Sequence, residues 1–501
     1  MLRVLSSPKR FCTGLTRRDF LHVGGMGTAG LGLSDLLARQ SAEAAGSNRE
    51  DSASFGQAKH CIILFLYGSP SQLETFDIKP QAPLEIRGTM RPISSSLWGL
   101  DVCEGLPAMA KVMDRTTIVR SVTHPHPIHG VAYAMTGVDK IDVPMELDPY
   151  DVRHHPYFGS VVEYLDRRKR GLSEFPQNVA LPFPFSSQRT DQPLRAGPYG
   201  AFLGAANNPI WTEFIGEGAK TITKSRAGGE FSFTGPEPYL GCTEESHFGI
   251  ASADLPAGLS LDRLNRRRTL LEQFDDSRRH LEQTLRVSSL SKFQQMAFSL
   301  ISSPRVAEAL DVRREPPENR ELYGMTLYGQ GCLAARRMIE AGTKLVTVFW
   351  DEYGLAGDAW DTHFDHYARM QDQLLPGFDK ACSGLIRDLD RRGMLDETLV
   401  VCLSEHGRTP KLNNAKGGGR DHWARAYSAL FAGGGIRRGQ VVGATDKYAS
   451  DVAERPISPK DLLATMYHLL GIGPDVRIPH QTGQPVPLLP EGSSVVPEML
   501  A

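Results

Sequence analysis

Three short segments in the C-terminal third of the chain combine carboxylates with histidines. They read Trp-Asp-Thr-His-Phe-Asp-His at 360–366, Ser-Glu-His-Gly at 404–407 and Gly-Arg-Asp-His-Trp at 419–423. Asp, Glu and neutral His are the side chains that hold zinc or manganese in proteins. Each segment follows or neighbours a strand-like apolar run, so a sheet could bring all three to one edge. The pattern therefore predicts a site for two metal ions.

The first segment offers one carboxylate and two competing histidines. Asp361 and His366 are five residues apart across the start of a predicted helix, so they can meet at one ion. His363 competes with His366 for that role, because both follow Asp361 within two helical turns. We expect Asp361 to share an ion with one of them.

The other two segments supply the remaining candidate ligands. Glu405 and His406 are adjacent, so on an extended segment their side chains would point apart. A turn at Gly407 would instead let them serve two neighbouring ions. His422 follows the flexible glycines 417–419 and is the candidate for the closing ligand.

The elements that must position these residues alternate between strand-like and helical patterns. Such alternation predicts an α/β layered sandwich, with a mostly parallel central sheet flanked by helices. In open α/β sheets, ligand sites lie at the carboxyl ends of the strands, which is where the candidate ligands fall. The predicted strands are the apolar runs 61–67, 116–122, 344–350 and 398–403, and the predicted helices are 329–340, 367–390 and 459–470.

The middle of the chain has a different composition. Residues 181–256 are rich in Pro, Gly, Ser and aromatic residues and show no clear periodicity, whereas 262–310 carry a strongly charged helical pattern. We interpret 181–320 as an insertion of loops and helices over the sheet. Long insertions in compact domains usually form lids or binding surfaces, so this one is expected to shape the substrate pocket.

The N-terminal residues resemble an export signal. Thr16-Arg17-Arg18-Asp19-Phe20-Leu21 is a twin-arginine signature, and a weakly apolar, glycine-rich stretch follows at 21–37. Ala42-Glu43-Ala44 offers a small-residue cleavage site. The stretch is too short and too rich in glycine for a stable membrane span. We therefore predict export by the twin-arginine translocase to the periplasm or another extracytoplasmic compartment.

The composition is that of an ordinary globular protein, with 41% hydrophobic and 23% charged residues. The net charge of −2 argues against nucleic acid or an anionic membrane surface as the main partner. The chain has seven cysteines and no CxxC spacing. We expect mostly free buried thiols, with a bridge at Cys103 or Cys242 as the alternative.

Several motifs resemble those of known families. The chain is similar to the exported bacterial family known as domain of unknown function 1501. It is more distantly similar to the alkaline phosphatase superfamily, which includes phosphomutases, nucleotide phosphodiesterases and sulfatases. The motifs are Gly68-Ser69-Pro70-Ser71-Gln72, Phe76-Asp77-Ile78-Lys79-Pro80, Arg120-Ser121, His129-Gly130, Met135-Thr136-Gly137, Trp360-Asp361-Thr362-His363, Glu405-His406-Gly407-Arg408-Thr409-Pro410, Gly419-Arg420-Asp421-His422-Trp423, Gly433-Gly434-Gly435 and Gly443-Ala444-Thr445-Asp446.

The superfamily pattern implies an alkaline phosphatase-like fold and a divided set of ligands. It assigns Asp361, His366 and His422 to one ion, and Glu405 and His406 to the other. Two ions about 4 Å apart can stabilise both the attacking and the leaving oxygen of a displacement at phosphorus. The resemblance implies zinc or manganese, with calcium or magnesium as alternatives.

The chain departs from that pattern after the first predicted strand. The superfamily has an aspartate there, whereas this chain has Tyr67-Gly68-Ser69, and Asp77 or Glu74 is the candidate substitute. Glu405 stands where aspartate is usual and is one methylene longer. Arg408, directly after the Glu-His pair, is a candidate catalytic residue that binds a substrate oxyanion, or else it pairs with a neighbouring carboxylate.

The nucleophile is the second departure. Superfamily hydrolases carry a Ser, Thr or modified Cys about ten residues before a Thr-Gly that resembles Thr136-Gly137, and Pro127 occupies that position. Thr123 is the candidate hydroxyl on the same loop. His129 is the other candidate catalytic residue, with a structural role at a helix start as the alternative. Three possibilities stay open: a hydroxyl nucleophile, attack by a metal-bound hydroxide, or no hydrolysis.

Two functional hypotheses follow. The first is an exported metallohydrolase that acts on a phosphate or sulfate ester, which is either a small molecule or part of a polymer. The second is a catalytically degenerate, metal-stabilised binding or scaffold protein of the cell envelope. The predicted organisation is a twin-arginine signal peptide at 1–45, an alkaline phosphatase-like domain at 46–490 and a C-terminal tail at 491–501.

Overall fold

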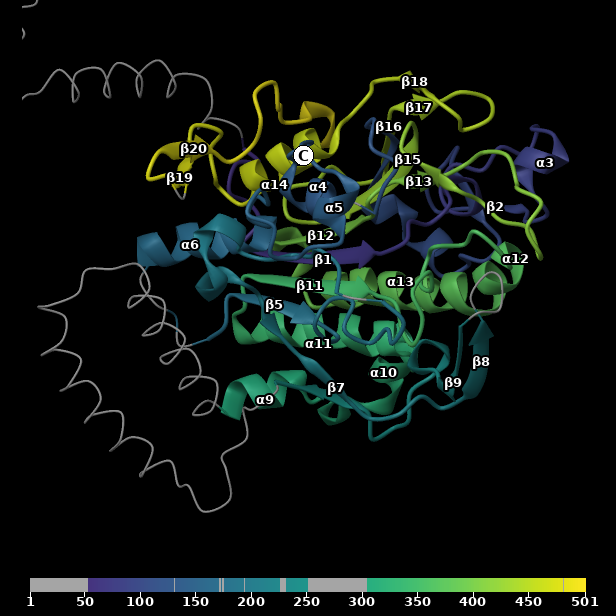
Figure 1. Cartoon of the computed structure of the whole chain (residues 1–501), viewed down its shortest axis with the longest axis horizontal. Coiled ribbons are helices and arrows are strands. Elements are labelled where there is room, and N and C mark those ends of the chain that lie inside the picture. Colours follow the sequence, from purple (N-terminus) through teal and green to yellow (C-terminus); the bar gives the residue numbers. More distant parts are fainter. Residues whose placement is uncertain are drawn as a thin grey trace, which may run out of the picture. The chain divides into compact units, whose positions relative to one another are not determined.

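An eight-stranded sheet forms the centre of the molecule (Figure 1). The computed structural model describes residues 53–501, except for 130, 171–172, 174, 193, 226–230, 251–303 and 481. The chain divides into two units, Met1–Phe55 and Gly56–Ala501, and the described helices and strands belong to the second. The predicted signal peptide at 1–45 and most of the charged stretch at 262–310 lie outside the described residues.

The sheet is mostly parallel, as predicted. The strands lie in the order β16-β4-β15-β12-β1-β11-β5-β6. β15 is antiparallel to both of its neighbours, and the other pairs are parallel. The four predicted strands are confirmed as β1, β4, β11 and β12. The bounds are β1 His60–Leu66, β4 Thr116–Val122, β5 Asn178–Leu181, β6 Ile210–Trp211, β11 Leu345–Trp350, β12 Thr398–Leu403, β15 Tyr427–Ala432 and β16 Gln440–Val442.

Helices cover both faces of the sheet, which explains why its central strands are almost entirely apolar. Every residue of β11 and β12 is buried, and β1 is buried except for His60. α11 (Leu327–Ala341) packs on β11 and β1 and against α13 (Leu375–Arg391). α4 (Val131–Thr136) and α14 (Pro459–Leu469) pack together on the opposite side (Figure 1). The layered α/β sandwich is therefore confirmed.

The predicted helices have the expected end signals. α11 begins after Thr326, whose hydroxyl accepts a hydrogen bond from the Gly329 amide, and it ends at Gly342 in the left-handed conformation. α14 begins with a capping box formed by Ser458 and Asp461. The helix predicted at 367–390 is interrupted by a π-helical turn, so its parts are α12 His366–Arg369, η9 Met370–Leu374 and α13.

The region predicted as an insertion consists of short elements where the structure describes it. β8 (Thr221–Ser225) and β9 (Ser232–Pro236) are antiparallel partners. β6 lies in this region but joins the edge of the central sheet, because it pairs in parallel with β5. The region thus adds one strand to the edge of the central sheet, and its other strands form small separate sheets. The remaining elements include β7 Glu213–Ile215, β10 His247–Gly249, α9 Pro304–Leu310 and α10 Pro317–Tyr323.

Residues 491–501, predicted as a tail, pack onto the rest of the second unit. Val496 and Met499 are fully buried. The amide of Ala501 donates a hydrogen bond to the carbonyl of Gly435 at 2.9 Å. These residues therefore contribute to the hydrophobic core.

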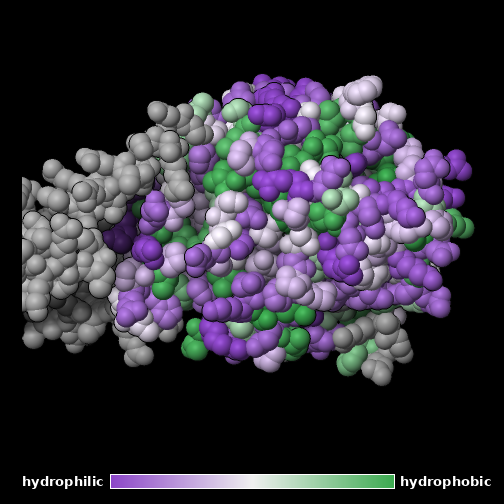
Figure 2. Space-filling model, turned by 90° about the horizontal axis from the view of Figure 1, so that it is seen from above, coloured by the Kyte–Doolittle hydropathy of each residue, from purple (hydrophilic) through white to green (hydrophobic). Residues whose placement is uncertain are grey.

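The surface and the cysteines match the expectation of an ordinary globular protein with free buried thiols. Hydrophilic residues cover most of the face seen in Figure 2. Among the described helices, none is long and apolar enough to cross a membrane. The six cysteines in the described residues are buried free thiols. Cys103 and Cys242 are among them, so the alternative of a bridge at either position is wrong.

Candidate metal centre

The loops that follow four strands meet at the carboxyl edge of the sheet. β1, β4, β11 and β12 run in the same direction, so the residues after them share one side of the molecule. Six side chains with ligand atoms gather there: His129 after β4, Asp361 and His363 after β11, Glu405 and His406 after β12, and His422 on β14 (His422–Trp423).

Three of these side chains form a triangle of ligand atoms. Asp361 Oδ1 lies 3.1 Å from His363 Nε2 and 3.4 Å from His422 Nε2, and the two nitrogens are 3.1 Å apart. A tetrahedral ion with bonds of about 2.0–2.1 Å holds its ligands about 3.3 Å apart. Basic atoms this close together require a proton or a cation between them. The residues therefore fit a divalent metal ion.

In three of the histidines, the Nδ1 atom, which points away from the other ligand atoms, contacts an oxygen atom. Carbonyl and carboxylate oxygens only accept hydrogen bonds, so each of these Nδ1 atoms carries a proton. A metal-binding histidine is usually oriented in this way, because its other nitrogen then faces the ion. The pairs are His363 Nδ1 with Asp421 Oδ1 at 2.7 Å, His422 Nδ1 with Pro127 O at 3.1 Å, and His406 Nδ1 with Gly407 O at 2.8 Å.

A second group of ligand atoms adjoins the triangle. His406 Nε2 and Glu405 Oε2 are buried and have no hydrogen-bond partner among the described residues. Burial, together with the charges of His422 and His129, lowers the pKa of His406 well below its usual value, so its Nε2 keeps a free lone pair. Ring nitrogens of His129, His406 and His422 lie within 4.8 Å of one another. This group shares His422 with the triangle.

His129, like His363, has a carboxylate next to each of its ring nitrogens. Nδ1 lies 2.9 Å from Glu405 Oε1, and Nε2 lies 3.4 Å from Asp361 Oδ2. Burial would lower the pKa of His129, but Asp361 and Glu405 outweigh burial and raise it to about 9. Burial would raise the pKa of Asp361, but Arg408 and His129 hold it well below its usual range. Two cations, Arg408 and His129, therefore balance the carboxylates of Asp361 and Glu405.

The glycine after β1 allows three loops to pack closely. The Gly68 amide donates a hydrogen bond to Glu405 Oε1 at 2.8 Å. A Cβ at this position would lie 2.4 Å from the backbone nitrogen of Asp361, and the φ angle of +90° also favours glycine. The ring of Tyr67 packs 5.2 Å from that of His129. Where the superfamily pattern has a carboxylate, this chain thus has a residue that permits close backbone contact.

Arg408, predicted as a catalytic residue, lies behind Asp361 and is fully buried. Its guanidinium donates hydrogen bonds to Asp361 and to the carbonyls of Gly68, Ser69 and Arg420. The alternative reading, in which it pairs with a neighbouring carboxylate, matches these contacts. Arg408 therefore holds Asp361 in place.

His366 lies apart from the triangle, against another carboxylate. Its Nδ1 is 2.8 Å from Thr362 Oγ1, and its Nε2 is 3.4 Å from Glu74 Oε2. Asp365 adopts a left-handed conformation, with φ of 46°, and α12 starts at the next residue. This turn places His366 away from Asp361, whereas His363 precedes it and contacts Asp361. The sequence offered two competing pairs, Asp361 with His363 and Asp361 with His366. The structure brings the first pair together.

Asp77 and Thr123 have partners outside the six side chains. Asp77 pairs with Lys79 at 3.0 Å and Arg120 at 3.5 Å, and it accepts a hydrogen bond from Thr445. The amide of Thr123 donates to the carbonyl of Ile457 at 2.9 Å.

Sequence reasoning did not select the groups that orient the ligands. Asp421 was visible as an acidic residue next to His422, and this proximity was the only signal available. The carbonyls of Pro127 and Gly407 gave no signal, because every residue carries a carbonyl. Their roles follow from the loop conformations alone.

Comparisons with known proteins identify a family and find several solved structures of low similarity. The family model described as "Protein of unknown function (DUF1501)" matches residues 58–500. A search of curated proteins finds no match. Similar solved structures include the PsFucS1 sulfatase from Pseudoalteromonas sp. (11% identity, TM-score 0.34, covering 84% of this chain and 69% of that one). They also include the lipoteichoic acid synthase LtaP from Listeria monocytogenes (11%, 0.34, 91% and 81%) and the phosphonate monoester hydrolase SpPMH from Silicibacter pomeroyi (11%, 0.33, 83% and 73%). At these TM-scores, none of the similarities assigns an activity to this chain.

Proposed function

Because the chain belongs to the DUF1501 family, whose description names no reaction, we propose its function from the chemistry of the metal centre. We propose that it is an exported, divalent-metal-dependent hydrolase of a phosphate or sulfate ester, carried by the twin-arginine translocase to the periplasm or another extracytoplasmic compartment. The resemblance of its motifs to those of the alkaline phosphatase superfamily supports this reaction class.

The observation that carries the proposal is the triangle of Asp361 Oδ1, His363 Nε2 and His422 Nε2, with edges of 3.1, 3.1 and 3.4 Å. These three residues would hold one ion, and His406 with Glu405 would hold a second. A divalent ion supplies charge that polarises an ester oxygen and lowers the pKa of a water molecule. Zinc or manganese suits this mixture of imidazole and carboxylate ligands better than calcium or magnesium, which prefer oxygen.

The other residues of the centre have distinct roles. Arg408 and the Gly68 amide position Asp361 and Glu405. His129 carries a proton between these two carboxylates, and the longer of its two contacts is made by Nε2, at 3.4 Å. An ion held by these carboxylates would displace that proton, so in the loaded centre a neutral His129 would serve as a proton acceptor.

The proposal requires no side-chain nucleophile. Pro127 stands where superfamily hydrolases have a hydroxyl, and its carbonyl contacts His422 at 3.1 Å. Thr123 remains the hydroxyl alternative on the same loop.

The test is turnover of a panel of phosphomonoesters, phosphodiesters and sulfate esters, with zinc, manganese, magnesium or calcium added. We expect His406→Ala to abolish activity, because it removes a buried ligand atom, and we expect Thr123→Ala to retain it. His480→Ala is the matched control, since this histidine contacts Thr482 and lies outside the centre. Stoichiometric metal without turnover of any ester would refute the hydrolase. Loss of activity in Thr123→Ala with metal retained would assign Thr123 as the nucleophile.

The lack of a hydroxyl at Pro127 also favours a second candidate. In this candidate the protein hydrolyses no ester and is a metal-stabilised binding or scaffold protein of the cell envelope. Metal would then raise the melting temperature of the wild type but not of His406→Ala, and no ester would be hydrolysed.

A further inference from the structure

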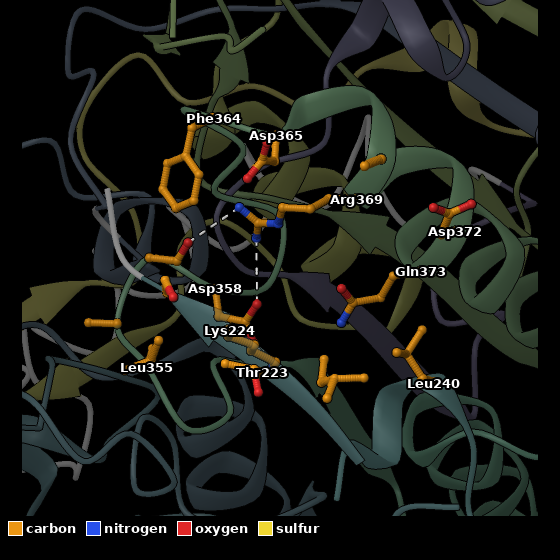
Figure 3. A pocket seen from close by; sticks show the side chains of 15 residues that line it. Thr223, Lys224, Leu240, Leu355, Asp358, Phe364, Asp365, Arg369, Asp372 and Gln373 are labelled. Carbon is orange, nitrogen blue, oxygen red and sulfur yellow. Dashed lines mark hydrogen bonds and ion pairs between the residues drawn. The ribbon is translucent and has the colours of Figure 1, made fainter. Parts of the chain in front are cut away.

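A cavity of about 440 Å³ adjoins the loop that carries Asp361 and His363 (Figure 3). Three segments line most of it: residues 222–225 of β8, the loop 355–358, and residues between 364 and 373 on the helical side. Cavities of this size commonly bind small molecules when apolar walls surround a few polar groups.

The cavity reaches the metal centre at Gly357. A Cβ built on this lining residue would lie 3.9 Å from Asp361 Oδ2. Arg369, also in the wall, donates hydrogen bonds to the carbonyls of Asp361 and Ala359, at 2.9 and 2.5 Å. Phe364 lines the cavity, while the preceding residue, His363, contacts Asp361. A molecule in the cavity would therefore lie next to the loop that carries Asp361 and His363.

The cations in the wall are already neutralised by protein groups. Lys224 pairs with both Asp358 and Glu237. Arg369 lies 3.6 Å from Asp358 and donates to backbone carbonyls, as Figure 3 shows in part. The cavity thus offers little attraction for the anionic part of an ester.

The other polar side chains in the wall are the carboxylates of Asp365 and Asp372, the amide of Gln373 and the hydroxyls of Thr223 and Ser225. Asp365 and Asp372 form no ion pair with any described residue, and Gln373 has a buried Nε2 without a hydrogen-bond partner among these residues. The side chains of Phe364 and Leu355 add apolar surface. A ring with several hydroxyl groups matches this wall, because it donates to carboxylates, accepts from an amide and packs its C–H face on apolar side chains.

We propose that this cavity is the subsite for the alcohol part of the ester, and that this alcohol is a neutral, hydroxyl-rich ring such as a hexose. The proposal rests on the proposed hydrolase function and adds its substrate class. Asp365 and Asp372 would repel a ring that carries a carboxylate, so the alcohol part is neutral while the ester group faces the metal centre.

Binding of the alcohol alone tests the subsite without turnover. Glucose and glucuronate would be titrated into the zinc-loaded full chain by calorimetry or saturation-transfer NMR. We expect glucose to bind at millimolar concentrations and glucuronate to bind more weakly. Gln373→Ala should weaken glucose binding roughly three- to tenfold by removing one hydrogen bond. Gln371→Ala is the matched control, because Gln371 is exposed on the same helical turn and does not line the cavity.

A filled cavity gives the second readout. Ala368→Trp should abolish glucose binding, since Ala368 lines the cavity and is itself exposed. It should lower kcat/KM at least tenfold for glucose 6-phosphate or glucose 6-sulfate and leave methyl phosphate or methyl sulfate unchanged. Glucose binding without turnover of any ester would refute the hydrolase and support the subsite. Turnover with no glucose binding, or with hexose esters unaffected by both Gln373→Ala and Ala368→Trp, would overturn the subsite and leave the hydrolase standing.

Discussion

The free energy of unfolding of the metal-free protein should fall as pH rises from about 6.5 to about 9, in part because of His129. The pKa of this residue is about 9 in the folded protein, against an ordinary value of 6.5. A histidine whose pKa is raised by folding stabilises the protein fully below its unfolded pKa, and this stabilisation is lost as pH rises through the folded pKa. The difference of about 2.5 units corresponds to about 3 kcal/mol.

Comparison with His129→Gln isolates this contribution. Glutamine keeps hydrogen-bonding capacity but carries no charge, so it leaves Asp361 and Glu405 without their shared proton. Other buried groups with raised pKa values, such as Asp351 at about 8 and Glu163 at about 7, titrate in both proteins. The wild type should therefore exceed the variant in stability by about 3 kcal/mol near pH 6.5, and this gap should close towards pH 9. Urea unfolding of chelator-treated proteins, followed by circular dichroism, measures it.

Metal binding should show the opposite dependence on pH. An ion beside Asp361 and Glu405 competes with the proton on His129, so metal affinity should rise with pH up to about 9, and binding should release that one proton. Calorimetry in buffers of different ionisation enthalpy counts that proton, and His129→Gln should release about one fewer.

The unfolding experiment has its own refuting outcome. If the stability gap between wild type and His129→Gln stays constant from pH 6.5 to 9, the two carboxylates do not keep His129 protonated.

Two further substitutions test the geometry of the centre. Asp421→Asn should weaken metal affinity by about 10–100-fold, because it replaces the charged acceptor that orients His363; competition with a chromogenic chelator measures the loss, and unchanged affinity would contradict the orienting role. Gly68→Ala should destabilise the protein by about 1–3 kcal/mol more than Gly99→Ala does. Both glycines have positive φ angles, but only at Gly68 would the added Cβ collide with Asp361, whereas nothing lies within 4 Å at Gly99. Equal destabilisation in thermal unfolding would mean that the collision is relieved.

The fold could be predicted well from local patterns. The runs of apolar residues at 61–67, 116–122, 344–350 and 398–403 correspond to β1, β4, β11 and β12, because strands buried on both faces need such runs. The edge strands were harder to predict. β6 has two residues and β16 has three, which is too short for a periodic pattern, and β6 lies in a region interpreted as an insertion.

The candidate site could be predicted only in outline. The placement of Asp361, Glu405 and His422 after successive strands indicated that they would meet. The residue spacing left His363 and His366 open, and the resemblance implied His366, but the structure brings His363 to Asp361. The difference depends on the left-handed conformation of Asp365, which non-glycine residues seldom adopt.

The sequence by itself determined the residue types of this centre and the edge of the sheet to which they belong. Both follow from local patterns and from the common direction of parallel strands. Only the tertiary structure decided which of these residues meet and in what protonation state. Three features arise from contacts between distant parts of the chain: the proton on His129, the ion pair of Arg408 with Asp361, and the cavity beside Gly357. Such contacts depend on how closely the loops pack. A glycine such as Gly68 permits close packing, but its presence in the sequence does not predict which residue will lie against it.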